Sequence, residues 1–313
     1  MFLPEIPAGL ERAEFARAVF VLEFQDPCDL TTAHLLRLRR ELLQATAVLA
    51  ALEGSAERFR QLFSPHVSAD VQGRRRHQKP TPPFALLPEE TQASLYEAGD
   101  LLRLPVIFWG KGIAAMGDFL RALQELGRQG ISRGEGSFEV IALETADPAG
   151  HFKKIWREGQ PVELLCPAFS SAFWELDRHG GVPSHLTLQF LTPARLLSHG
   201  RPLFRPEFAR LFPFVLRRVT SVLFSHCGVE LEMDPRELLA QASLVRESES
   251  TLRWEDWRTL EGQEHAIDLG GVVGAITLAG APLNHLAWVL RLGALMNIGK
   301  SASFGQGHYH LGE

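Results

Sequence analysis

The sequence is poor in cysteine and has no long apolar run. Its three cysteines, Cys28, Cys166 and Cys227, are far apart and lack metal-ligand spacing, which argues against a disulfide framework and a zinc site. We therefore expect no metal, no cofactor and a reduced, cytoplasmic compartment. No stretch of about 18 apolar residues occurs, and the opening segment lacks both a basic start and a continuous apolar core. We expect neither secretion nor a membrane span.

An excess of positive charge is also missing. The formal net charge is −5, so any nucleic-acid binding must come from local patches rather than from the field of the whole protein. One basic patch lies between residues 195 and 218, where the acid Glu207 stands among arginines. These arginines are Arg195, Arg201, Arg205, Arg210, Arg217 and Arg218. The second patch consists of Arg74, Arg75, Arg76 and Lys79. Each patch taken alone is equally compatible with an ordinary solvated face.

The chain is long enough for two domains. Its 313 residues suit two domains of roughly 150 residues each. In the first half, the residue pattern predicts a strand at 16–24, a helix at 33–52, a strand at 101–109 and a helix around 119–126. The proline-rich, polar residues between 54 and 88 predict a surface loop. This order of strands and helices is that of a ferredoxin-like domain.

The second half repeats this order. We expect a strand from about residue 184, a helix at 206–227 that contains Pro213, a polar helix-like stretch at 234–250, a strand at 270–280 and a final helix at 283–295. The predicted fold is α+β, with tandem ferredoxin-like (RRM-like) domains, each an antiparallel sheet with helices on one face. The expected domains are residues 1–150, with a basic insertion at about 54–88, and residues 184–313, joined by a linker at 151–183.

Two glycine-rich segments occupy matching places in the halves. Gly299, Gly305 and Gly307 follow the last helix, and Gly130, Gly134 and Gly136 follow the helix around 119–126. Glycine can adopt backbone conformations closed to other residues, so the later loop suits close approach to a phosphate backbone. It also offers Lys300, Ser301 and Ser303 as a charge and hydroxyl groups. A tight helix-to-strand turn remains the alternative for such a loop.

Several segments together resemble the CRISPR precursor-RNA processing endoribonuclease family of the RAMP superfamily. They are LQFLTPARL at 188–196, WEDW at 254–257, GGVVGAITLAG at 270–280 and NIGKSASFGQGHYHL at 297–311. They occur in the family's order. Three segments of the first half resemble the family less specifically: PPFAL at 82–86, GDLLRLPVIFWGKG at 99–112 and GRQGISRGEG at 127–136. The resemblance implies two ferredoxin-like domains and CRISPR repeat RNA as the partner.

The resemblance also implies an activity in antiviral defence. It is cleavage of precursor CRISPR RNA within its repeats, without a metal, by attack of a ribose 2′-OH on the adjacent phosphate, which leaves 2′,3′-cyclic phosphate and 5′-OH ends. The alternative is a non-catalytic RAMP-type RNA-binding subunit of a CRISPR complex. A nucleotide-binding enzyme is disfavoured, because neither glycine loop opens a helix and no GxxxxGK spacing occurs. The sequence does not reveal which repeat sequence is recognised or whether other CRISPR-associated subunits bind. It also leaves open the oligomeric state, including a possible homodimer.

The chemistry directs attention to histidine and lysine. Imidazole titrates near the working pH and an ammonium group offsets negative charge. His34 stands at the first turn of the first helix, about where family members place a catalytic histidine, and it is the leading candidate. His66 and His77 lie beside the basic loop cluster, and Lys300 is a candidate for phosphate contact and for charge neutralisation. An ordinary surface histidine near a helix cap is the alternative for His34.

A second group of residues is expected to grip RNA. Phosphate contacts of this kind position the RNA rather than specify its sequence. Arg195 and Arg201 come first, with Arg217 and Arg218 as helpers. The full set of expected RNA contacts is Arg74, Arg75, Arg76, Arg195, Arg201, Arg217, Arg218, Gly299, Lys300, Ser301, Ser303, Gly305 and Gly307. Trp254 and Trp257 are candidates for base stacking, and core packing is expected for at least one of them.

Overall fold

A computed structural model describes residues 6–65, 80–88, 95–132, 134–181, 183–256 and 269–313. The chain divides into two compact units, which we call the N-terminal unit (Glu14–Ser170) and the C-terminal unit (Met1–Ala13 with Ser171–Glu313). The short strand β8 (Ser170–Ser171) lies at the division. Residues 151–183, expected to form a linker, contain the strand β7 (Phe152–Arg157) and the helix α7 (Ala172–Arg178).

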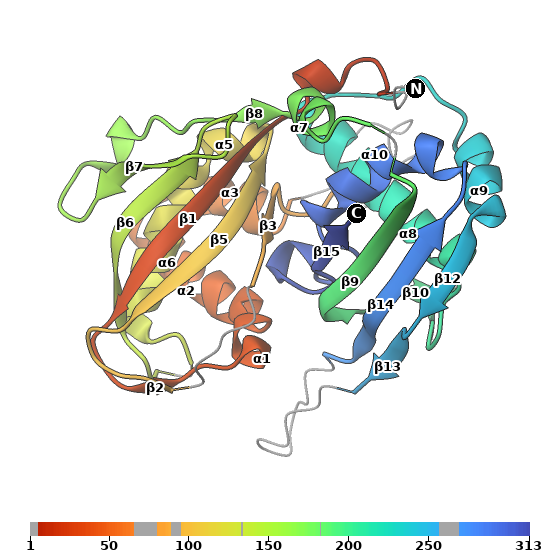
Figure 1. Cartoon of the computed structure of the whole chain (residues 1–313). Coiled ribbons are helices and arrows are strands. Elements are labelled where there is room, and N and C mark those ends of the chain that lie inside the picture. The colour runs from red at the N-terminus through yellow and green to blue at the C-terminus, as the bar shows by residue number, and fades with distance from the viewer. Residues whose placement is uncertain (1–5, 66–79, 89–94, 133, 182, 257–268) are drawn as a thin grey trace. The chain divides into compact units, whose positions relative to one another are not determined.

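The N-terminal unit is built on an antiparallel sheet in the order β3-β5-β1-β6-β7. The strands are β1 (Glu14–Phe24), β3 (Phe84–Leu86), β5 (Leu101–Trp109), β6 (Phe138–Ala146) and β7, and β2 (Cys28–Asp29) pairs separately with β4 (Leu95–Tyr96). The helices are α1 (Thr32–Leu35), α2 (Leu38–Glu53), α3 (Ala56–Phe63), α5 (Lys111–Ala114), α6 (Met116–Gln129) and the 3-10 turn η2 (Val162–Leu164). Figure 1 shows α2, α3 and α6 on one face of this sheet.

An aromatic cluster holds the helices of the N-terminal unit to the sheet. Phe119 of α6 is fully buried, and its ring centre lies 5.2 Å from that of Phe20 on β1 and 5.3 Å from that of Phe108 on β5. Phe63 of α3 stacks on the same ring at 5.6 Å. Aromatic pairs at these separations add about 0.5 to 1.5 kcal/mol each beyond the area that they bury.

The C-terminal unit has a second antiparallel sheet, in the order β12-β14-β9-β15. The strands are β9 (His185–Ala194), β12 (Arg246–Ser250), β13 (Arg253–Glu255), which also pairs with β14 (Gly271–Ala279), and β15 (Tyr309–Gly312); β10 (Leu197–Ser198) and β11 (Arg201–Pro202) form a hairpin. The helices are α7, α8 (Phe208–Val222), α9 (Pro235–Leu244) and α10 (Leu283–Ala294), with the 3-10 turns η1 (Leu10–Arg12) and η4 (Ala302–Phe304) and the π turn η3 (Leu223–Cys227).

The predicted α+β fold with two ferredoxin-like units is confirmed. In each unit a strand at the centre of the sheet is followed by helix, two strands, helix and a fourth strand, which pairs beside the first. This antiparallel order is the ferredoxin-like arrangement. The strand expected at 101–109 is β5, and helix α8 runs through Pro213.

Two expected helices are wrong in detail. The helix predicted at 33–52 is interrupted, because α1 ends at Leu35 and α2 begins at Leu38. The helix-like stretch at 234–250 ends at Leu244, and its last residues form β12. β12 is an exposed edge strand of charged and hydroxyl residues, so its sequence has no apolar alternation to reveal it. The stretch expected as an irregular loop at 54–88 also contains α3 and β3.

Candidate functional site

The glycine-rich loop, residues 296–308, connects α10 to β15 in the C-terminal unit. Gly299, Gly305 and Gly307 have φ angles of 90°, 94° and 68°, in the left-handed region that favours glycine. All three glycines thus adopt backbone conformations that other residues rarely take. Asn297 and Ser301 also have positive φ angles, of 56° and 60°.

The close approaches made by these glycines are to the protein's own backbone. A Cβ atom on Gly307 would lie 1.9 Å from the carbonyl oxygen of Ile298, and one on Gly299 would lie 2.7 Å from that of Arg195. Gly305 and Gly307 are buried, and the carbonyl of Gly305 accepts a hydrogen bond of 2.6 Å from the hydroxyl of Thr192. Gly305 and Gly307, expected to contact RNA, therefore have their surroundings filled by protein.

Only the tip of the loop reaches the surface. Lys300 is exposed and Ser301 is half-buried, whereas residues 302 to 309 are buried. The backbone N–H of Lys300 donates to the carbonyl of Arg195 at 3.0 Å, which ties the tip to the end of β9. The loop thus offers one ammonium group and one hydroxyl to a ligand.

Arg218 lies inside the C-terminal unit, contrary to its expected contact with RNA. It is 7% exposed, and its guanidinium donates to the carbonyl of Met296 and to the hydroxyl of Ser303, each at 3.0 to 3.1 Å. Burial lowers the pKa of Arg218 to about 10, because desolvation disfavours the charged form. Ser303 is also buried, so both residues belong to the support of the loop.

Within the described residues, the other arginines of the predicted RNA-binding set are more accessible. Arg201 is exposed on β11, Arg195 is half-buried after β9, and Arg217 is exposed with its guanidinium 5.0 Å above the ring of Phe214. The β10–β11 hairpin turns through His199 and Gly200, with φ angles of 51° and 78°. The backbone N–H of Leu203 donates a hydrogen bond of 3.0 Å to the carbonyl of Leu196. The structure therefore places Arg195 just before this short hairpin and Arg201 on its second strand.

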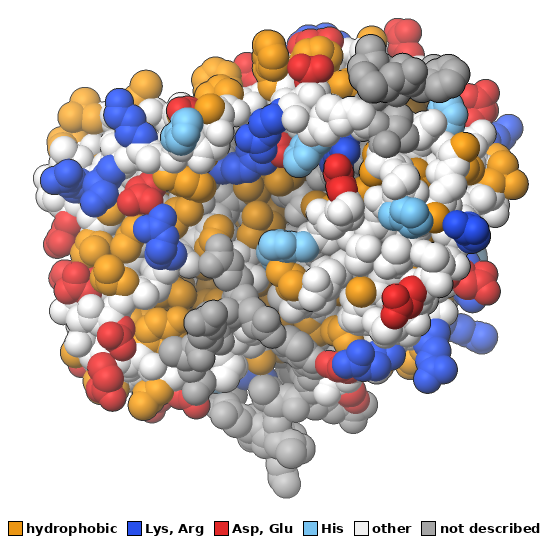
Figure 2. Space-filling model, viewed as in Figure 1, with side chains coloured by type: hydrophobic (Ala, Val, Ile, Leu, Met, Phe, Trp, Pro, Cys, Tyr) orange, Lys and Arg blue, Asp and Glu red, His pale blue; other side chains and the backbone are white. Residues whose placement is uncertain are grey.

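Figure 2 shows that the charges on the viewed face are mixed. Lysine and arginine side chains alternate with aspartate and glutamate, and no single sign dominates. This agrees with a net charge of −5 and makes local contacts, rather than a general field, the source of any RNA affinity.

His34 is oriented by a capping box at the start of α1. Its Nδ1 atom accepts a hydrogen bond of 3.1 Å from the backbone N–H of Thr31 and lies 3.0 Å from the Thr31 hydroxyl. The side chain is half-buried. With Nδ1 engaged, Nε2 is the ring nitrogen left for other partners. Sequence reasoning did not single out Thr31, although a threonine three residues before a hydrogen-bonding side chain is typical of a capping box.

Several predicted residues lie outside the part of the chain that is described. They are His66, His77, Arg74, Arg75, Arg76 and Trp257. Trp254 is half-buried, and its ring centre lies 5.3 Å from that of Phe204, a side chain that is 59% exposed. Trp254 is thus partly covered by an aromatic neighbour in the C-terminal unit.

The end of the chain packs mainly as core. Tyr309 is buried, and its hydroxyl donates to the carbonyl of Leu290 at 2.7 Å. Burial raises the pKa of Tyr309 far above its usual value, so this phenol is a poor candidate for proton transfer. His308 is buried and His310 is exposed, with ring centres 5.5 Å apart. The two rings therefore lie on the same side of the chain at the start of β15.

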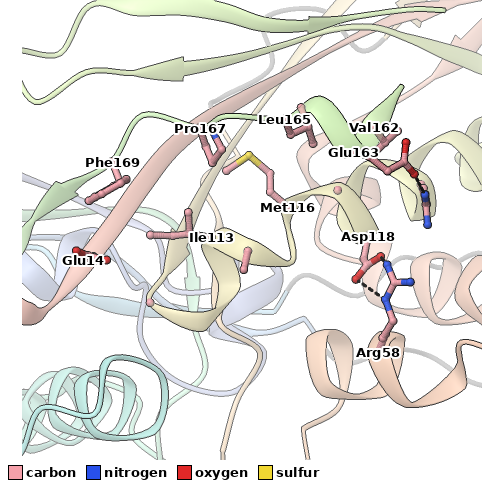
Figure 3. Close-up of a pocket in the computed structure, with 14 residues that line it drawn as sticks. Glu14, Arg58, Ile113, Met116, Asp118, Val162, Glu163, Leu165, Pro167 and Phe169 are labelled. Carbon is pink, nitrogen blue, oxygen red and sulfur yellow. Dashed lines mark hydrogen bonds and ion pairs between the residues drawn. The ribbon is translucent and has the colours of Figure 1, made fainter. Parts of the chain in front are cut away.

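The N-terminal unit contains a separate open pocket of about 470 Å³ (Figure 3). Its apolar lining comprises Ile113, Met116, Val162, Leu165, Pro167 and Phe169. Two ion pairs stand at its edge, Arg58 with Asp118 and Arg121 with Glu163. Because each arginine is held by a carboxylate, the pocket offers little to a phosphate. None of the predicted site residues lines it.

Within the described ranges, no group of three or more histidine, cysteine, aspartate or glutamate side chains could hold a metal ion. Over the same residues, no helix combines the length and the apolar character that crossing a membrane requires.

Comparisons with known proteins agree with this architecture. The sequence model of the CRISPR-associated endoribonuclease Cas6 matches residues 188–309, and a model described as the AF_1859_N N-terminal domain matches residues 50–167. The chain matches none of the curated proteins.

Solved structures of similar fold include Cas6 proteins. Thermus thermophilus Cas6 superposes with a TM-score of 0.52 at 17% identity, covering 96% of this chain and 98% of that one. A Cas6 product complex gives 0.52 at 18% identity, covering 96% and 100%. A partial complex of Cas6, RT, Cas1 and Cas2 gives 0.55 at 16% identity, covering all of this chain and 47% of that one.

These structural likenesses concern the fold. The similarity to the Cas6 family comes from the sequence match, which runs from within β9 through the glycine-rich loop to the first residue of β15. It also agrees with the resemblance carried by the motifs at 188–196, 270–280 and 297–311. Residues 188–309 are thus similar in sequence to the CRISPR-associated endoribonuclease Cas6 family.

Proposed function

We propose that the protein cleaves precursor CRISPR RNA within its repeats, without a metal, by attack of a ribose 2′-OH on the adjacent phosphate. The products would carry 2′,3′-cyclic phosphate and 5′-OH ends. The observation that carries the proposal is the glycine-rich loop within the family match, which holds Lys300 at an exposed tip. An ammonium group on a fixed backbone suits contact with an RNA phosphate.

His34 is the proposed proton-transfer group. A general base takes the 2′-OH proton through an unprotonated ring nitrogen, and such catalysis contributes roughly 10² to 10⁴ in rate. Nε2 serves as that nitrogen when the ring proton sits on Nδ1 and is donated to the Thr31 hydroxyl, 3.0 Å away. The Thr31 backbone N–H favours the other tautomer, because it donates to Nδ1. The Thr31 hydroxyl is therefore the group that makes the active tautomer accessible.

The test uses repeat RNA from the protein's own genomic locus, incubated with the protein in EDTA. Wild type is expected to cut at one position, and a 2′-deoxy nucleotide before that position is expected to block cutting. His34→Ala is expected to slow cleavage by at least roughly 10²-fold with little change in RNA affinity. His151→Ala, at an exposed histidine of the same unit, is the matched control and keeps full activity.

A companion pair of variants tests the tautomer. Thr31→Val removes the hydroxyl but keeps the backbone N–H, and it is expected to slow cleavage by about tenfold; Thr31→Ser restores the rate. Equal rates for Thr31→Val and wild type would exclude this role of the hydroxyl. If His34→Ala cuts normally, His34 is not the proton-transfer group, and His66, His77 and Lys300 are tested next.

A second function, RNA binding without cleavage, is favoured by one observation. The hydrogen bond from the Thr31 backbone to His34 completes a helix cap, and capping alone would explain a histidine at this position. Tight binding of the repeat RNA with no cutting under any condition would establish a non-catalytic RNA-binding subunit.

A further inference from the structure

Arg218 is a buried cation that donates hydrogen bonds to the glycine-rich loop. Its Nε and Nη2 atoms donate to the carbonyl of Met296 at 3.1 and 3.0 Å, and Nη2 also donates to the hydroxyl of Ser303 at 3.1 Å. Burying a guanidinium is costly unless its hydrogen bonds are satisfied. A cation kept in this place needs a reason beyond filling space.

The two anchor points of Arg218 enclose the exposed tip of the loop. Met296 precedes Lys300 and Ser303 follows it, so the guanidinium fixes both ends of the segment that carries the ammonium group. Inside the segment, the side-chain amide of Asn297 donates to the carbonyl of Ala302 at 2.9 Å. The Lys300 backbone is itself tied to Arg195. The tip is therefore held at its two ends and at its centre.

We propose that Arg218 is a positioning residue that sets Lys300 for its contact with an RNA phosphate. The proposal rests on the proposed function, in which Lys300 makes that contact. Arginine suits this role because its planar fork can direct two N–H groups at one carbonyl and still reach a hydroxyl, a geometry that a lysine ammonium does not reproduce. Methionine would fill similar space with no donor.

The helix pattern agrees with an inward-facing Arg218. Phe208, Leu211, Val215, Arg218 and Val222 follow one another at helical spacings, and all are buried. The neighbouring Arg217 falls off this stripe and is exposed. The arginine thus occupies a core position of α8 from which it reaches the loop.

The experiment measures how RNA affinity depends on salt, using repeat RNA made uncleavable by the 2′-deoxy nucleotide. Each lost phosphate contact reduces the slope of log affinity against log salt by roughly 0.7 to 0.9. Lys300→Ala is expected to show this reduction, with affinity about tenfold weaker at low salt. Arg218→Met is expected to reduce the slope by the same amount as Lys300→Ala. Arg218→Lys is expected to give a slope between those of Arg218→Met and wild type. The double variant with Lys300→Ala should lose nothing further.

Val219→Ala is the matched control. Val219 is a fully buried neighbour on α8, so the variant destabilises the unit while leaving the hydrogen bonds of the loop in place, and its salt slope should equal that of wild type. Ser303→Ala removes one of the hydrogen bonds and is expected to weaken binding about threefold only while Lys300 is present. This variant decides the question if Arg218→Met does not fold.

Three results would overturn the proposal. A wild-type slope in both Arg218→Met and Ser303→Ala, with a reduced slope in Lys300→Ala, would refute the role of Arg218 and leave the Lys300 contact standing. Equal losses of affinity with and without Lys300 would show that Arg218 acts by another route. A wild-type slope in Lys300→Ala would show that Lys300 does not contact an RNA phosphate, and this proposal would then fail. The cleavage assay would still test the proposed enzymatic function separately.

Discussion

The two units carry the same glycine turn at the same place in the same fold, but the turns differ in what surrounds them. In the N-terminal unit, Gly130, Gly134 and Gly136 have φ angles of 85°, 93° and 68°. Their counterparts Gly299, Gly305 and Gly307 have 90°, 94° and 68°. The first turn connects α6 to β6, and the second connects α10 to β15. In each unit these are the second helix and the fourth strand of the ferredoxin-like pattern.

Both turns are also closed by the same kind of hydrogen bond. Ile131 donates to the carbonyl of Gly136, and Ile298 donates to that of Gly307, each at 3.1 Å. The segment enclosed is residues 132–135 in the N-terminal unit and the longer residues 299–306 in the C-terminal unit. The additional length holds the 3-10 turn η4 and the residues bonded by Arg218 and Thr192.

The difference separates what a glycine turn needs from what a binding loop needs. The shorter turn packs Gly136 against the side chain of Cys28. Exposed Gly134 and Glu135 form its outer part. The longer turn is buried around polar anchors and exposes a cation. The two turns share their backbone conformation, and the second also has side chains that bond to the loop around its tip.

The largest expected difference between the turns is in stability. Gly307→Ala should lower the free energy of unfolding by about 3 to 5 kcal/mol, because the new Cβ meets rigid backbone and the φ angle is strained. Gly136→Ala has the same φ strain but should cost only about 2 kcal/mol, because its Cβ meets the Cys28 and Ile131 side chains rather than backbone. Urea unfolding measures both. Gly200→Ala, with open space around it, is the control at about 1 kcal/mol; equal losses at 307 and 200 would contradict the expected clash.

A smaller effect is expected at Asn297, which combines a positive φ angle with a hydrogen bond to Ala302. Asn297→Ala should lower the free energy of unfolding by about 2 kcal/mol, since the side-chain donor is lost and alanine is strained at this angle. Asn297→Gly loses the same donor without the strain and should cost about 1 kcal/mol. If both variants unfold at the same urea concentration, the angle contributes nothing and the side chain alone matters.

The smallest expected effect concerns the rate at which Cys28, which packs against the N-terminal turn, is alkylated. Burial, followed by the charges of Asp29 and Glu135, raises the pKa of the Cys28 thiol. Since the thiolate is the reactive form, Cys28 should be alkylated at pH 8 at least about tenfold more slowly than exposed Cys166. Its rate should rise as the pH increases toward the raised pKa. Mass spectrometry of both sites gives the ratio, and Gly136→Ala should bring the two rates closer together; a ratio near one in the wild type would show that the turn opens freely.

Much of the fold could be read from the residues. The expected strand at 101–109 was correct because β-branched and aromatic residues fill it, and positive φ angles at three glycines followed from the residue type itself. The exposed edge strand β12 was missed, because five charged and hydroxyl residues carry no burial pattern. Its pairing with β14, fixed by residues far along the chain, decides its conformation.

The candidate site was less predictable. Arg217 and Arg218 were treated alike, although the helical spacing from Phe208 through Val215 places only Arg218 on the apolar stripe. The Thr31 cap was readable from its spacing to His34. The carbonyl groups that receive the Arg218 guanidinium were not readable, since they belong to a loop some eighty residues later, Arg218 and Met296 being 78 apart.

The sequence by itself determined the duplicated ferredoxin-like pattern, the places of the two glycine-rich turns and the similarity of residues 188–309 to the Cas6 family. Local conformational preference and side-chain chemistry are sufficient for these features. Only the tertiary structure decided that Ser303, Gly305 and Gly307 face protein while Lys300 faces outward, and that Arg218 is a buried anchor. Burial depends on contacts between residues distant in sequence, and the close packing of the interior leaves one of two adjacent arginines inside and the other in solvent.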